Sequence, residues 1–98
     1  MRIRFALHGI GFEWDSRKAA ANLRKHAVSF EEACEVFFDP FVTLVDAATE
    51  EEDRDAAIGM TAGSRLLVVV HVLREREVFR IISARPAIPA ERRLYENP

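Results

Sequence analysis

The sequence predicts an α+β protein in which two N-terminal helices pack on a mainly antiparallel sheet of about four strands. Apolar residues recur at helical spacing across residues 15–38. Residues 41–85 then change to short runs rich in Val, Ile and Leu, which favour strands. Pro86 and Pro89 end this sheet region, and Pro89 suits the first turn of a short C-terminal helix. We expect one domain over residues 1–98, because a chain of this length supports one hydrophobic core.

Capping signals define the two predicted helices. Asp15 is a good N-cap for a helix that runs to about His26. Ser29 and Glu32 then fit a capping box, in which each side chain satisfies a free backbone donor of a second helix. Pro40 stops this helix, since proline lacks a backbone donor and disfavours helix in the residue before it.

The strands are predicted from β-branched and aliphatic runs. The two strongest are residues 65–73 and 78–85, which are separated by a charged turn. The weaker strands are residues 41–45 and 56–60, and the N-terminal segments 3–7 and 12–14 are loosely alternating or extended. Gly9 and Gly11 interrupt these N-terminal segments. The final helix runs from Pro89 to about Tyr95.

The strong hairpin sorts its side chains into two faces. A tight turn centred on residues 75–76 pairs His71 with Arg80. One face is then continuous core, and it carries Leu66, Val68, Val70, Val72, Phe79 and Ile81. The other face carries Arg65, His71 and Arg80 among aliphatic residues. Arg85 joins them only if Pro86 or a β-bulge turns it to that face.

These groups suit RNA cleavage without a metal. In that reaction a base takes the proton of the ribose 2′-hydroxyl, cations stabilise the phosphoryl oxygens, and an acid protonates the leaving 5′ oxygen. Arginine binds phosphate at any working pH, and His71 or His26 could act as base or acid. The alternative for His71 and Arg80 is a pair of edge groups that reach solvent or a carboxylate.

Two further basic spots have ordinary structural alternatives. Lys25 and His26 could join the site, or could simply stabilise the C-terminal dipole of the first helix. Arg92, Arg93 and Tyr95 could follow a phosphate backbone or stack a base, or could form a solvated helix face.

Charge is unevenly distributed along the chain. The net charge of -2 argues against nucleic-acid binding by itself. Residues 31–55, however, hold ten of the sixteen acids and one base, so they carry -9 and the remainder carries +7. This pattern fits a protein that meets a polyanion with one face and a basic partner with another, or two unrelated solvated faces. The acidic segment 31–55 is our candidate contact for a basic partner.

Other classes of site lack their sequence signals. The sequence has no Gly-rich phosphate loop and no nucleophile elbow, and His8, His26 and His71 lack metal-ligand spacing. The single cysteine, Cys34, fits a small buried residue. We therefore expect no metal and no cofactor. The longest strongly apolar run, residues 66–70, is too short to span a membrane, and we expect a cytoplasmic protein.

The chain resembles the BrnT toxins of bacterial type II toxin-antitoxin systems. The resembling segments are FEWD (12–15), NLRKH (22–26), VSFEEA (28–33), FFDP (37–40), IG (58–59), RLLVVV (65–70), RIISAR (80–85), ERR (91–93) and Tyr95. The resemblance implies a RelE/ParE-like fold and an endoribonuclease that cleaves mRNA and halts translation. It also implies neutralisation by a BrnA-type DNA-binding antitoxin, with operator DNA bound only through the complex.

The resemblance also implies a set of site residues. By matching position, the basic RNA site would contain Lys25, His26, Arg54, Arg65, Arg80 and Arg85. The predicted face of the hairpin independently indicates Arg65, His71 and Arg80. Arg65 and Arg80 belong to both sets.

The chain also departs from the family pattern. Ala27 occupies a position where family members usually have glycine. Pro86 occupies, and Pro89 lies near, a position where they usually have a basic residue. Residues 1–11 make the N-terminal segment longer than is usual in the family. Two other functions stay open. One is a ParE-like toxin that poisons a protein such as gyrase by docking, and the other is a decayed toxin that only binds its antitoxin and regulates transcription.

Overall fold

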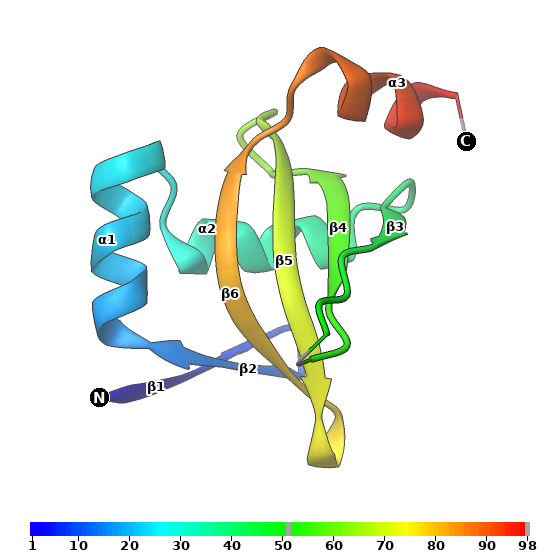
Figure 1. Cartoon of the computed structure of the whole chain (residues 1–98). Helices are drawn as coiled ribbons and strands as arrows, with labels where there is room; N and C mark the ends of the chain where they lie inside the picture. The colour runs from blue at the N-terminus through cyan, green and yellow to red at the C-terminus, as the bar shows by residue number, and fades with distance from the viewer. Residues whose placement is uncertain (51, 98) are drawn as a thin grey trace.

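Helix α2 (Phe30–Cys34) crosses one face of a six-stranded sheet and helix α1 (Ser16–His26) stands along the side of the sheet in the computed structural model, which describes residues 1–50 and 52–97 (Figure 1). The strand order is β1-β2-β6-β5-β4-β3. The strands are β1 (Arg2–Leu7), β2 (Ile10–Asp15), β3 (Thr43–Asp46), β4 (Asp55–Met60), β5 (Leu66–Arg74) and β6 (Val78–Pro86). The remaining elements are helix α3 (Pro89–Glu96) and two short 3-10 turns, η1 (Glu35–Phe38) and η2 (Glu75–Glu77).

The α+β class is confirmed, but the predicted layout of four strands and two N-terminal helices in a RelE/ParE-like arrangement is wrong. The chain begins with the hairpin β1-β2, and both helices follow it. His8 and Gly9, which interrupt the apolar pattern, form the tight turn of this hairpin with positive φ angles of 50° and 80°. The hairpin joins the sheet because β2 runs parallel to β6, through the pairs Phe12 with Phe79 and Glu13 with Arg80.

The two predicted N-caps, Asp15 and Ser29, are confirmed, but the carboxylate of Glu32 in the predicted capping box binds Arg65 and not the Ser29 backbone. Asp15 Oδ1 accepts hydrogen bonds from the backbone of Arg17 at 2.7 Å and Lys18 at 3.3 Å, and these bonds hold the pKa of Asp15 below its usual range. Ser29 Oγ accepts a bond from the Glu32 backbone at 3.1 Å. Between the two helices Ala27 adopts a left-handed conformation with φ of 57°.

The core has two parts. The larger lies between the helices and the sheet and includes Phe12, Trp14, Phe30, Leu67 and Ile81. A smaller cluster lies on the other face of the sheet, where Ala56, Ile58, Leu66 and Val68 are buried and Tyr95 of α3 packs against them. Trp14 is buried, and so is Cys34, as predicted; burial raises the pKa of the Cys34 thiol to about 12.

Two close contacts fix the helices on the sheet. Asn22 of α1 donates to the carbonyl of Ala84 at 2.8 Å, and its Oδ1 accepts from the Ala84 backbone at 3.1 Å. Asn22 therefore closes the edge of β6 where β2 no longer pairs with it. At Gly59 of β4, an added Cβ would lie 2.9 Å from both Cβ and O of Val36, so only glycine allows η1 to pack this closely.

Candidate functional site

The predicted register of the hairpin β5-β6 is wrong by one residue at its tip. Arg80 pairs with Val72, and His71 pairs with Ile81. The turn contains three residues instead of two, and Arg76 and Glu77 both have positive φ. Since side chains alternate along a strand, a shift of one residue exchanges the two faces. His71 and Arg80 therefore lie on opposite faces of the sheet.

His71 belongs to the core on the helix-covered face. It is 3% exposed, and its ring packs edge to face against Phe37 at 4.8 Å and Phe79 at 5.7 Å. Its Nδ1 lies 3.1 Å from the carbonyl of Val69. Burial lowers the pKa of His71, because the charged form would lose its hydration. The interpretation of His71 as a catalytic group beside Arg80 is corrected accordingly.

A β-bulge brings Arg80 and Arg85 to the same face. The register shifts between Val70 and His71, so that Arg80 pairs with Val72 while Arg85 pairs with Val68. We call this face, turned away from α1 and α2, the open face. Its side chains on these two strands are Val68, Val70, Val72, Arg80, Ser83 and Arg85.

Three of the predicted arginines bind acceptors within the protein. Arg65 donates to the carbonyl of Ala27 through both Nη1 and Nη2 at 3.1 Å, and Nη1 also lies 3.0 Å from Glu32 Oε1. Arg85 makes a bidentate pair with Glu91, at 2.8 and 2.7 Å, which raises the pKa of Arg85 and lowers that of Glu91. The remaining pair joins Arg54 Nε to Glu52 Oε1 at 2.9 Å.

Arg80 differs from these three because no carboxylate in residues 1–50 or 52–97 lies within 4.0 Å of its guanidinium. Its neighbour on β2 is Glu13, and Glu13 is paired on β1 with Arg4. A row of charged residues, Arg4, Glu13 and Arg80, therefore crosses three adjacent strands on the open face. Arg65 and Arg80 were predicted to share one site, but Arg65 stands seven positions before Val72, the partner of Arg80, which is about 23 Å along an extended strand.

Glu13 is the site residue that the sequence analysis missed. Phe12 and Trp14 point into the main core, so Glu13 between them points to the open face. It lines a hollow of about 680 Å³, which we call the Glu13 hollow. The other lining residues are Arg2, Glu52, Asp53, Val72, Leu73, Arg74 and Glu75. The alternation in the motif FEWD predicts which way Glu13 points, but the parallel pairing with β6 has no local signal.

Lys25 and His26 lie beside the other end of β6. They line a small hollow of about 220 Å³ together with Ile82 and Ser83. Lys25 is exposed and His26 is half-buried at the end of α1. The structure thus brings these two residues near the Arg85 end of the strand and leaves Arg80 at the opposite end.

Helix α3 presents its two arginines to solvent and uses its tyrosine as an anchor. Arg92 and Arg93 are exposed. Tyr95 donates its hydroxyl to Asp39 Oδ2 at 2.6 Å, which raises the pKa of Tyr95 to about 12. Burial raises the pKa of Asp39, but hydrogen bonds from Tyr95 and from the backbone of Phe41 and Met60 bring it below the usual range.

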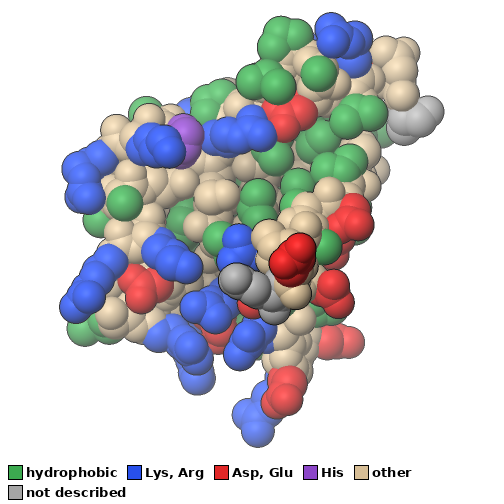
Figure 2. Space-filling view, viewed as in Figure 1, with side chains coloured by type: hydrophobic (Ala, Val, Ile, Leu, Met, Phe, Trp, Pro, Cys, Tyr) green, Lys and Arg blue, Asp and Glu red, His purple; other side chains and the backbone are tan. Residues whose placement is uncertain are grey.

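The open face has an uneven charge distribution. Figure 2 shows Lys and Arg side chains gathered along its left and lower parts, with acidic side chains along its right edge. Several acids of the segment 31–55 have internal roles, since Glu32, Glu35, Asp39 and Glu52 each accept bonds from other parts of the protein. Among the described residues, no group of three or more His, Cys, Asp or Glu side chains is arranged to hold a metal ion.

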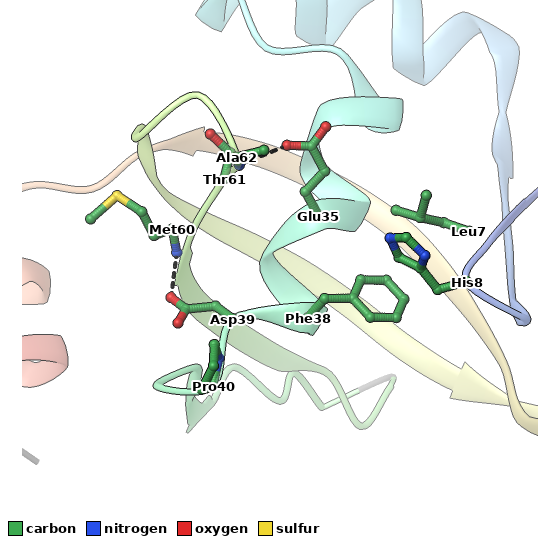
Figure 3. A pocket seen from close by; sticks show the side chains of 9 residues that line it. All are labelled: Leu7, His8, Glu35, Phe38, Asp39, Pro40, Met60, Thr61 and Ala62. Atoms are coloured by element: carbon green, nitrogen blue, oxygen red, sulfur yellow. Dashed lines mark hydrogen bonds between the residues drawn. The ribbon is translucent and has the colours of Figure 1, made fainter.

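A second pocket, of about 450 Å³, lies between the β1-β2 turn, η1 and the β4-β5 loop (Figure 3). Two carboxylates line it, but both bind backbone donors. Glu35 Oε1 accepts from Ala62 at 2.9 Å, and Asp39 Oδ2 accepts from Met60 at 2.7 Å. The ring of His8 packs edge to face on Phe38 at 4.9 Å. The polar groups of this pocket therefore fasten the loop and the turn to the sheet.

Comparison with known families identifies the chain. A family model described as "Ribonuclease toxin, BrnT, of type II toxin-antitoxin system" matches residues 14–91, which is most of the protein. The chain belongs to the BrnT family. The matched residues include α1, α2, both strands of the hairpin β5-β6 and the start of α3. Members of this family are ribonuclease toxins that act with an antitoxin in a type II system.

A solved structure supports the BrnT assignment. The ribonuclease toxin BrnT of Brucella abortus is 26% identical to the chain and superposes with a TM-score of 0.63. The alignment covers 76% of this chain and 92% of the Brucella protein. A comparison with curated proteins found no match. Within the described residues no helix is both long and apolar enough to cross a membrane.

Proposed function

We propose that this BrnT-family protein is a metal-independent endoribonuclease that cleaves mRNA on the open face of its sheet and so inhibits translation. The observation that carries the proposal is that the guanidinium of Arg80, the neighbour of Glu13 on the adjacent strand, has no carboxylate of residues 1–50 or 52–97 within 4.0 Å. An arginine without an internal partner can give its whole donor fork to a phosphate. Membership of a ribonuclease toxin family supports RNA as the substrate.

The remaining cations would extend this site along the RNA. Arg2 and Arg74 line the Glu13 hollow, and Arg4 lies beside Glu13 on β1. Lys25 and His26 flank the far end of β6. Positive side chains that follow an extended face bind a phosphate backbone without regard to sequence. In this arrangement Arg54, Arg65 and Arg85, which bind internal acceptors, shape the site, while Arg92, Arg93 and Tyr95 of α3 stay peripheral to it.

We further propose that a BrnA-type antitoxin neutralises the protein and that the complex binds operator DNA through the antitoxin. The family belongs to type II systems, in which toxin and antitoxin act as a pair. The described exposed acids of the segment 31–55, Glu31, Asp46, Glu50, Asp53 and Asp55, would favour a basic region of the partner. Charge reversal of Glu50 and Asp53 with no change in affinity for the antitoxin at low salt would contradict this contact.

The proposed activity is tested by incubating the purified protein with a defined single-stranded RNA in excess EDTA. We expect cleavage by the natural protein and a loss of about 10²-fold to 10³-fold in Arg80→Ala, because a donor to the charge that develops on phosphate is removed. Arg24→Ala, which removes an exposed arginine of α1, is the matched control. Circular dichroism verifies that each variant is folded. Equal cleavage by Arg80→Ala, or no cleavage by the natural protein, would contradict the proposal.

A further inference from the structure

Glu13 occupies an unusual place for a carboxylate. On the open face it lies between Arg4 on β1 and Arg80 on β6, its direct partners in the two neighbouring strands. Adjacent strands are about 4.8 Å apart, so both guanidinium groups can reach a ligand placed over Glu13. The two arginines make no ion pair within 4.0 Å in the part of the chain that the structure describes.

The carboxylate of Glu13 is largely buried and nearly unbound. The residue is 8% exposed, and its one ion pair within 4.0 Å among the described residues is with Arg2, at 3.9 Å. No hydrogen-bond donor in residues 1–50 or 52–97 reaches it, yet none of its oxygens is fully sealed from solvent. The oxygens of Glu13 therefore stay open to a ligand that enters the hollow. Glu13 also lines a second hollow, of about 400 Å³, on the side of Arg4 and Phe5.

We propose that Glu13 is the general base of RNA cleavage, with Arg4 and Arg80 holding the phosphate on either side of it. The proposal rests on the ribonuclease function proposed above and assigns the base within that site. Glu13 and Arg4 precede the residues that the family model matches, so the assignment comes from the geometry of this chain.

The proposed step is a transesterification at phosphorus. The carboxylate of Glu13 takes the proton of a ribose 2′-hydroxyl, and the 2′ oxygen forms a bond to the adjacent phosphorus. The bond between phosphorus and the 5′ oxygen breaks, and the leaving oxygen takes a proton from water. The products are a 2′,3′-cyclic phosphate and a 5′-hydroxyl end, and Glu13 returns its proton to the solvent. Arg80 and Arg4 stabilise the charge that builds on the phosphoryl oxygens.

The histidines do not offer an alternative base at this end of the sheet. His71 is buried on the opposite face. His8 packs against Phe38 in the second pocket, and His26 lies beside Ser83 at the other end of β6. Glu52 also lines the Glu13 hollow, but it is bound to Arg54, which lowers the pKa of Glu52.

The first test compares Glu13→Gln with the natural protein on a single-stranded RNA in EDTA. We expect the cleavage rate to fall by about 10²-fold to 10⁴-fold, while affinity for the same RNA with 2′-O-methyl groups stays within about threefold. Glu13→Asp should retain part of the activity. Glu96→Gln, the same change at an exposed position on α3, serves as the control. A Glu13→Gln protein that is folded and cleaves within threefold of the natural rate would overturn the assignment.

The outcomes separate this proposal from the proposed function. Cleavage by the natural protein and by Glu13→Gln, but not by Arg80→Ala, would remove Glu13 as the base and keep the ribonuclease. No cleavage by the natural protein would overturn both. A 2′,3′-cyclic phosphate on the product, detected by mass spectrometry, is expected, whereas a 3′-hydroxyl end would exclude the 2′-hydroxyl as the nucleophile.

Discussion

The two ends of strand β6 carry arginines on the same face, but these arginines have different surroundings. At the far end Arg85 is held by both oxygens of Glu91, and nearby Arg65 is held by Glu32 and the carbonyl of Ala27. At the near end Arg80 has no such partner in the described residues and lies beside Glu13. A guanidinium that already binds two acceptors must give them up to bind phosphate, whereas Arg80 gives up no ion pair with the described residues.

The hydrogen-bond partners of an arginine therefore indicate whether its role is structural or functional, and its presence on a face alone does not. Arg65 joins the end of α1, the start of α2 and the start of β5. Arg85 joins β6 to α3. Both lie where elements meet, and both are bound by groups that the fold itself supplies. Variants at the Arg85 end of β6 should therefore affect stability, whereas variants at the Arg80 end should affect cleavage.

The largest effect on stability is expected for Arg65→Ala. Loss of its charged hydrogen bonds should lower the free energy of unfolding by about 1–2 kcal/mol, discounted because the side chain is 38% exposed. Arg80→Ala, the matched change at the other end, should cost less than about 0.5 kcal/mol. Urea denaturation of the two variants measures both values. Equal stability losses, or a greater loss for Arg80→Ala, would break the distinction between bound and free arginines.

The next effect concerns His71, on the face opposite Arg80. Burial lowers its pKa, so above about pH 6.5 both the folded and unfolded forms are neutral and stability is complete. As the pH falls below about 6.5, the unfolded chain binds a proton that the folded protein does not, and stability falls by at most about 1.4 kcal/mol per pH unit. Urea midpoints between pH 7.5 and 5 measure this loss.

A His71→Leu variant provides the control for that titration. It should remove part of the acid sensitivity without changing the pH at which the cleavage rate reaches its plateau, because His71 is buried away from the open face. An acid dependence of stability that is unchanged in His71→Leu would assign the effect to another group.

The smallest effect is expected at Ala27, whose carbonyl binds Arg65. Its φ of 57° is a left-handed conformation, which costs a residue with a Cβ about 1–2 kcal/mol in the folded state. Glycine avoids this strain, but the greater entropy of its unfolded chain cancels part of the gain in stability. Ala27→Gly should therefore raise the free energy of unfolding by about 0.5–1 kcal/mol. The same change within α1, Ala21→Gly, should lower it by about 1 kcal/mol. Thermal melts of the two variants give opposite shifts if the account is correct.

Much of the fold follows from local signals in the sequence. Asp15 and Ser29 cap the helices as predicted, and the runs of aliphatic residues predict β5 and β6. The register of this hairpin does not follow, because both of its faces are largely apolar and neither can be distinguished by pattern. The turn residues Arg76 and Glu77 adopt positive φ without the Gly or Asn that normally predicts it.

Only part of the candidate site could be predicted, because its composition depends on strand register and pairing. Arg80 could be singled out because it stands in a strong strand, but the position of His71 depended on a register that was wrong by one residue. Glu13 could not be found from local pattern, since its neighbour Arg80 is 67 positions away in the chain and the two strands pair through only two residues. Parallel pairing between such short segments depends on tertiary packing of α1 and the core.

RNA should bind at the Arg80 end of the open face, and chemical-shift mapping by NMR with a 2′-O-methyl RNA locates the bound strand. We expect the largest changes in backbone chemical shift at Arg4, Glu13, Val72 and Arg80. Smaller changes are expected at Lys25 and His26. Shifts confined to the end of β6 that contains Arg85, or to helix α3, would contradict it.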